Sequence, residues 1–142
     1  MSNPAVKGDV VKYRLLNRSK QTVLASEVEL ADTSWTRMKG LLGRGAEDFP
    51  SGEGLWIEPS QGVHTIGMKF PIDVLYLDRE HRIIHICHKL APFRIAALKF
   101  KARSVIELPA GTLAQTQTSV GDVLEISASK AEEGGTCAAT QV

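Results

Sequence analysis

The sequence is poor in cysteine, in net charge and in long apolar runs. Cys87 and Cys137 are its only cysteines. Two cysteines placed so far apart provide neither a disulfide framework nor metal-ligand spacing, so we expect free thiols in a reducing compartment. A formal net charge of +1 provides no broad electrostatic surface for nucleic acid or anionic lipid. We therefore expect no nucleic-acid partner.

The chain also lacks targeting and cofactor signals. No stretch is long and apolar enough to span a bilayer, and the N-terminal segment has no apolar core of the secretory type. We expect a cytoplasmic protein without a membrane partner. Phosphate-binding loops, dinucleotide glycine patterns and a serine nucleophile elbow are missing from the sequence. The sequence therefore identifies no cofactor, and we predict no metal site.

What is present is a series of short segments with strand patterns. A length of 142 residues suits one domain. Alternation predicts a hairpin from residues 10–16 and 23–30. Further strands are expected at residues 55–57, 72–77, 83–90, 105–108 and 123–126. Residues 72–77 are apolar on both faces, which places that strand at the centre of a sheet.

One segment has helical periodicity. A capping residue among 32–34 precedes Trp35 and Met38, which fall on one face at helical spacing, and Gly43 ends the pattern. Many short strands with one short packed helix predict a mainly β fold, either a β-sandwich or a partly closed barrel. We assign residues 10–128 to this single domain, residues 1–9 to a mobile N-terminus and residues 129–142 to a disordered tail.

Asp73 is the most unusual residue of the predicted central strand. An unpaired buried carboxylate costs roughly several kcal/mol, so this one needs a cation or amide donors. Arg37 and Arg44, in or near the predicted helix, are the candidate cations. Two interpretations stay open: Asp73 is a buried strut that fixes the preceding loop to the sheet, or it contacts a ligand.

Three other side chains could join Asp73. His64 lies on a loop between strands and could act as a base, a ligand or a simple hydrogen-bonding group. Met68 either packs against the helix or lines an apolar pocket. Glu107 meets Asp73 if their strands are neighbours, and two close carboxylates can divide into acid and base or bind a hard cation.

Two further clusters have plain interpretations. His81, His85 and Cys87 share one face of the strand at 83–90 by parity, so a metal site there is an alternative to an accidental run. The basic run from Arg94 to Arg103 is interpreted as a solvated loop or irregular edge, with a polyanion site as the alternative.

The chain resembles the bacterial and archaeal domain-of-unknown-function family one-nine-two. The matching pieces are Arg37–Leu42, Gly54–Ile57, Val63–Val74, Glu107–Gly111 and Val120–Asp122. The resemblance implies a mainly β sandwich or barrel of jelly-roll type, and it implies no activity because none is established for the family.

The chain also departs from the family. Many members have Trp-Met-x-Asn-Thr ahead of the Pro-Leu-Asp motif, whereas this chain reads His64-Thr65-Ile66-Gly67-Met68 before its Pro-Ile-Asp. A polar role of the missing Asn and Thr therefore does not carry over. Many members also begin with an export signal, which this chain lacks, so a periplasmic or surface role does not carry over.

Three functions follow from these observations. The first is a small binding module with a polar pocket for a small anionic or sugar-like ligand. The second is an enzyme that uses His64, Asp73 and Glu107 as acid–base groups, with or without a metal. The third is a structural or partner-binding domain. The candidate pocket residues are Arg37, Arg44, His64, Met68, Asp73 and Glu107.

Overall fold

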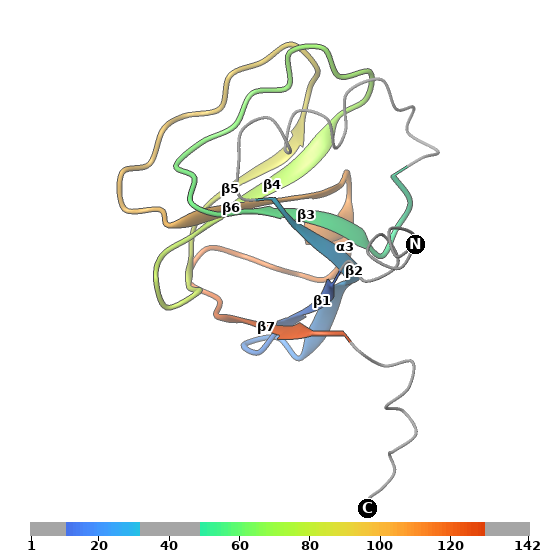
Figure 1. The fold of residues 1–142 in the computed structure, drawn as a ribbon, viewed down its shortest axis with the longest axis vertical. Helices are drawn as coiled ribbons and strands as arrows, with labels where there is room; N and C mark the ends of the chain where they lie inside the picture. Colours follow the sequence, from blue (N-terminus) through green and yellow to red (C-terminus); the bar gives the residue numbers. More distant parts are fainter. Residues whose placement is uncertain (1–10, 32–48, 130–142) are drawn as a thin grey trace, which may run out of the picture.

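Seven short strands form one curled sheet in the computed structural model, which describes residues 11–31 and 49–129 (Figure 1). The strand order is β5-β4-β6-β3-β2-β1-β7. The elements are β1 (Lys12–Asn17), β2 (Thr22–Ala31), β3 (Glu53–Ile57), β4 (Ile72–Leu77), β5 (Ile83–Leu90), β6 (Ser104–Pro109), α3 (Thr112–Gln115) and β7 (Leu124–Ala128). The predicted mainly β fold is confirmed, in the partly closed barrel form.

The strand positions follow the sequence pattern closely. β1 and β2 form the predicted hairpin, and β4 and β5 form a second one. Asp78 closes the second turn because its Oδ1 accepts the backbone N–H groups of Glu80 and Arg82, each at 2.9 Å. All strand neighbours are antiparallel except β2 and β3, which run parallel.

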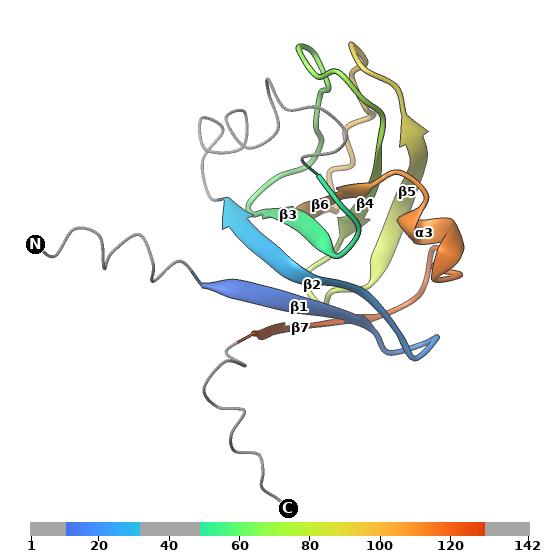
Figure 2. The same cartoon turned by 90° about the vertical axis from the view of Figure 1, so that its right-hand side faces the viewer.

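The concave face of the sheet encloses one apolar cluster to which every strand contributes. Leu75 and Leu77 of β4 lie in this cluster. Trp56 also lies here, with the rings of Tyr13 and His81 edge-on to its indole at 5.3 and 6.0 Å between centroids. Leu113 of α3 is fully buried in the same cluster, so the short helix closes one side of the interior (Figure 2).

A second apolar cluster lies on the outer face of β3, β4 and β6. Ile72, Val74 and Tyr76 belong to it, so β4 is buried on both faces as its sequence predicts. Two loops, residues 58–71 and 91–103, cover this face and run side by side in both views (Figures 1 and 2). The Tyr76 hydroxyl donates to Ala97 O at 2.7 Å and ties the second loop to the sheet. Burial, with a smaller contribution from Cys87, raises the pKa of Tyr76 to about 12.

The two edges of the sheet meet at one end. Ile83 N donates to Asp122 O, and Gly121 N donates to Ile83 O, both at 2.8 Å. Leu124 N donates to His81 O at 2.9 Å, and Arg82 and Val123 form an antiparallel bridge. These bonds join the start of β5 to the start of β7 and partly close the barrel.

Some predictions fall outside the described residues. The predicted helix with Trp35 and Met38 lies there, as do the candidate cations Arg37 and Arg44, the predicted N-terminal segment 1–9 and all but the first residue of the predicted tail 129–142. Among residues 11–31 and 49–129, the helix is α3, in a segment whose sequence is compatible with either a helical turn or a loop. Within these residues no helix is long and apolar enough to cross a bilayer.

Candidate functional site

Asp73 is a fully buried strut held by backbone amides. Its Oδ1 accepts the N–H of Lys89 at 2.9 Å. Its Oδ2 accepts the N–H groups of Gly111 at 3.1 Å and Leu113 at 2.9 Å. The carboxylate thereby joins β4 to the end of β5 and to the start of α3. Amide donors meet the need that the sequence identified, and this geometry favours the strut over the ligand contact.

Glu107 does not join Asp73, although β4 and β6 are neighbours as the pairing hypothesis required. In the register of these strands Asp73 lies opposite Leu108, whereas Glu107 lies opposite Val74. Side chains of one strand alternate between faces, so the two carboxylates point to opposite faces of the sheet. The hypothesis of an acid–base pair from Asp73 and Glu107 is therefore wrong.

His64 and Met68 belong to the loop that covers the outer face. His64 is half-buried, forms an antiparallel bridge with Ile95 and accepts Ile66 N at Nδ1 over 3.3 Å. Met68 is buried in the outer-face cluster. No contact joins His64 to Asp73 in the part of the chain that the structure describes.

Thr65 organises this region and was not singled out by sequence reasoning. Its hydroxyl donates to Ala91 O at 2.6 Å and accepts Arg94 N at 2.9 Å. Its backbone N–H donates to Arg94 O at 2.8 Å, and its carbonyl accepts Phe93 N at 2.9 Å. The sequence shows Thr65 only as a polar residue in an apolar stretch. Its hydrogen-bond partners could not be predicted because they lie on the loop of residues 91–103.

The suspected histidine and cysteine group separates in the structure. His85 Nε2 and Cys87 Sγ are 3.7 Å apart on β5, whereas His81 precedes the strand and packs against Trp56. Within the described ranges, His, Cys, Asp and Glu side chains form no group of three that could hold a metal ion.

The remaining His85–Cys87 pair is uncharged at neutral pH. Burial lowers the pKa of His85, and the nearby Lys99 lowers it further. Burial raises the pKa of the Cys87 thiol, and Lys99 only partly opposes this effect. A thiol with a raised pKa is a poor nucleophile, so this arrangement lacks the thiolate of a cysteine–histidine catalytic pair.

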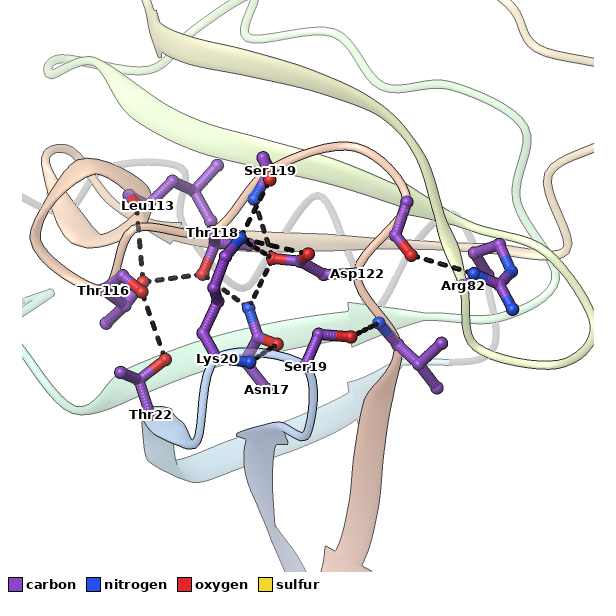
Figure 3. Close-up of polar contacts among 12 residues, drawn as sticks. Asn17, Ser19, Lys20, Thr22, Arg82, Leu113, Thr116, Thr118, Ser119 and Asp122 are labelled. Carbon is purple, nitrogen blue, oxygen red and sulfur yellow. Dashed lines mark hydrogen bonds and ion pairs between the residues drawn. The ribbon is translucent and has the colours of Figure 1, made fainter.

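A second polar cluster joins the β1–β2 turn to the segment before β7 (Figure 3). The buried Asn17 amide donates to Asp122 Oδ2 at 2.9 Å and to Thr118 Oγ1 at 3.2 Å. Lys20 Nζ lies 2.8 Å from Asp122 Oδ2 and donates to Ser119 Oγ at 3.0 Å. Burial acts to raise the pKa of Asp122, but the hydrogen bonds from Asn17, Lys20 and Ser119 outweigh it, so the pKa is lowered. We call these five residues the clasp.

A cleft of about 620 Å³ is the candidate binding site. Three connections form its walls: the segment after β3, the β4–β5 turn and the end of the loop before β6. Its lining residues are Pro59, Ser60, Gln61, Asp78, Arg79, Glu80, Phe100, Lys101, Ala102 and Arg103. An adjoining hollow of about 300 Å³ is lined by Glu58, Arg79 and Arg103.

Three cations line the cleft, and two of them, Arg79 and Lys101, have no carboxylate partner among the described residues. Arg103 donates from Nε to Glu58 Oε2 at 3.0 Å, which leaves its terminal nitrogens without a hydrogen bond to the described residues. Within the same ranges the side chains of Arg79 and Lys101 make no ion pair. Asp78 already accepts two backbone amides through one oxygen. Of the lining carboxylates, only Glu80 is without a described partner.

The walls of the cleft are fixed by hydrogen bonds. Gln61 Nε2 donates to Phe100 O at 2.9 Å, and Ser60 Oγ donates to Gly62 O at 2.8 Å. Arg103 N donates to Leu77 O at 2.7 Å. Sequence reasoning missed this site because its cations come from two separate connections. The basic run supplied Lys101 and Arg103, but nothing local indicated that Arg79 would face them.

The fold and these features define a class: small mainly β proteins with a partly closed seven-stranded barrel and loop-built surface sites. Within that class the chain belongs to the DUF192 family, described as an uncharacterized ACR family, whose profile matches residues 15–126. The resemblance seen in the sequence is thus confirmed.

Curated relatives are similar in sequence, and two solved structures share the fold. The UPF0127 proteins of Thermococcus sibiricus and Pyrococcus abyssi are 27% and 31% identical over 116 residues, which cover 78% of this chain and 73% and 95% of theirs. A Sinorhizobium meliloti crystal structure, provisionally described as a transcription regulator, matches with a TM-score of 0.67 and 25% identity over 81% of this chain and 92% of that one. A Novosphingobium aromaticivorans protein of unknown function matches with a TM-score of 0.61 and 23% identity, covering 80% and 82%.

Proposed function

We propose that the protein is a binding module for a small anionic ligand, held in the cleft around Arg79, Lys101 and Arg103. The observation that carries this proposal is that three cations line one hollow of about 620 Å³. That volume is in the range of small-molecule sites, which are typically about 300–1,000 Å³. Guanidinium groups are suited to carboxylate and phosphate because their planar forks can bind two oxygens.

The remaining lining suits a sugar ring that carries the anion. Phe100 offers an exposed aromatic ring at the rim, and an aromatic ring packs readily on an apolar face while its surroundings stay wet. Ser60 and Gln61 add polar groups to the lining. We therefore favour a sugar phosphate or sugar acid. The site lies away from the pocket expected from the sequence, since the cleft lining contains none of His64, Met68, Asp73 and Glu107.

The competing enzyme function has less support. Acid–base catalysis through Asp73 conflicts with the three backbone amides on its carboxylate. The provisional regulator description of the Sinorhizobium meliloti relative does not carry over, because among the described residues the helix α3 has four residues and is too short for groove reading. We expect a cytoplasmic ligand and no nucleic acid.

The test is a titration with ligands that separate the sugar from the anion. Glucose 6-phosphate and glucuronate are compared with glucose and inorganic phosphate by calorimetry and by thermal unfolding. A ligand at a hundred times its dissociation constant stabilises a protein by about 2.7 kcal/mol. We expect the sugar anions to raise the melting temperature and glucose to leave it unchanged.

Paired variants assign the effect to the cleft. Arg79→Gln together with Lys101→Gln is expected to abolish the stabilisation. The control is Arg14→Gln, because Arg14 is an exposed cation of β1 outside the cleft lining. Equal stabilisation of the double variant, or no response to any anion, contradicts the proposal.

A further inference from the structure

The loop that precedes β6 carries large apolar side chains on its surface. Phe93 and Leu98 are each 63% exposed and Ile95 is 77% exposed. Ile66 of the neighbouring loop is 48% exposed. In Figure 1 these two loops lie at the opposite end of the molecule from β7. A contiguous group of exposed apolar residues on a small protein is characteristic of an interaction surface.

The same loop lies in a part of the chain that contains only positive charge. Between Glu80 and Glu107 the sequence has no Asp or Glu, and it has six cations: Arg82, Lys89, Arg94, Lys99, Lys101 and Arg103. The net charge of the whole chain is only +1 because the acidic residues lie elsewhere in the sequence. A surface that alternates apolar residues with Arg and Lys is complementary to one that alternates apolar residues with Asp and Glu.

The loop has an open backbone edge at one residue, Ile95, within residues 93–98. Ile95 lies opposite His64 in an antiparallel bridge, flanked by the bonds Thr65 N to Arg94 O at 2.8 Å and Ala96 N to Val63 O at 2.9 Å. A residue at such a position directs its own N–H and C=O away from the paired segment. Among the described residues these two groups of Ile95 have no hydrogen-bond partner.

We infer that this edge, residues 93–98, binds an extended acidic segment of a partner protein by adding it as a strand beside the loop. Main-chain hydrogen bonds to Ile95 would hold the segment, as in other cases of strand addition. Its apolar side chains would contact Phe93, Ile95 and Leu98, and its carboxylates would meet Arg94 and Lys99. Open backbone N–H and C=O groups can pair with an added peptide strand, whereas a lipid surface does not supply that ladder of hydrogen bonds.

The experiment is an NMR titration of the isotopically labelled protein with a capped peptide of four Glu-Val repeats. We expect the amide signals of Ile95 and its neighbours to shift on binding, with an affinity that falls as salt is added. A peptide of four Lys-Val repeats is expected to leave the spectrum unchanged. Phosphatidylglycerol vesicles are titrated in parallel, and ultracentrifugation of the protein alone tests whether a second copy occupies the edge.

Two variants and a matched control separate the backbone and charge contributions. Ile95→Pro removes the outward N–H but none of the bonds to residues 61–65, and it is expected to abolish peptide binding. Arg94→Glu is expected to weaken binding roughly threefold to tenfold, whereas Arg14→Glu, the same charge change on β1, leaves it unaltered. Thermal unfolding of each variant confirms that it folds. Equal binding of the Lys-Val peptide, binding to vesicles without a peptide effect, or self-association through this edge contradicts the inference.

Discussion

Asp73 is a fully buried side chain whose carboxylate is held on both oxygens. It is an ionisable group in the middle of an apolar strand, and three backbone amides from two distant segments converge on it. Buried charge is tolerated only where hydrogen bonds replace the lost hydration. The carboxylate therefore acts as a joint between β4, β5 and the turn that leads into α3.

Replacing Asp73 by Ala is expected to destabilise the protein by about 3–5 kcal/mol, because three buried amides lose their acceptor. Asp73→Asn keeps one acceptor oxygen and is expected to cost less, about 1–3 kcal/mol. Urea unfolding at neutral pH measures both values. A melting temperature of Asp73→Ala within a degree or two of the parent would show that the amides find other partners.

At the scale of single residues, the sequence predicted an acid in an apolar strand and its need for partners. The partners themselves were not predictable. Amide donors have no side-chain signature, and Lys89, Gly111 and Leu113 reach Asp73 only through the pairing of β4 with its neighbours. The alternation rule did predict the two faces of β4 correctly, because period and burial are local properties.

Among the elements, β3 contains a glycine, Gly54, with close neighbours on adjacent strands. It lies between β2 and β6, and Gly54 is its second residue. A Cβ added at Gly54 would lie 2.9 Å from Leu108 Cδ2 and 3.2 Å from Val28 Cγ2. Both neighbours belong to the interior cluster, which has little room to yield.

Gly54→Ala is therefore expected to destabilise the protein by about 1–3 kcal/mol through overpacking. Ser26→Ala is the control, because Ser26 is exposed on β2 and a surface change of this size stays within about 0.5 kcal/mol. Chemical denaturation of both variants provides the comparison. Equal stability of the two would mean that the barrel interior can expand at β3.

The pairing of elements was predicted less well than their positions. The two hairpins follow from turn residues between alternating segments. The parallel contact of β2 with β3 and the placement of β6 between β3 and β4 depend on long connections, for which sequence period gives no information. The cleft was unpredictable for the same reason. Arg79 and Lys101 line it together because the β4–β5 turn and the loop before β6 both contribute to it.

For the molecule as a whole, the clasp fixes the segment before β7 to the β1–β2 turn. Asn17, Lys20 and Asp122 connect the first hairpin to the approach of the last strand. The pKa of Asp122 is lowered in the folded state. A carboxyl with a lowered folded pKa contributes stability above its unfolded pKa, about 3.9, and this contribution is lost as the pH falls through the folded value.

Asp122→Asn is accordingly expected to be less stable than the parent at pH 7, by about 1–2 kcal/mol. The difference should shrink as the pH falls from the unfolded pKa of about 3.9 through the lower folded pKa, where the parent's carboxylate becomes protonated. Thermal unfolding across a pH series measures the two curves. Parallel curves at all pH values would show that Asp122 does not stabilise the fold through its charge.

β1 is completed only by the last strand, since it pairs with β7 along its length and Ser129 N donates to Lys12 O at 2.7 Å. During synthesis on a ribosome, the edge of β1 that faces β7 stays unpaired until β7 (Leu124–Ala128) has emerged. Loop-closure entropy makes such distant pairing slow. The adjacency of residues 12 and 129 also makes this fold suited to circular permutation, with the old ends linked and new ends opened in an exposed turn.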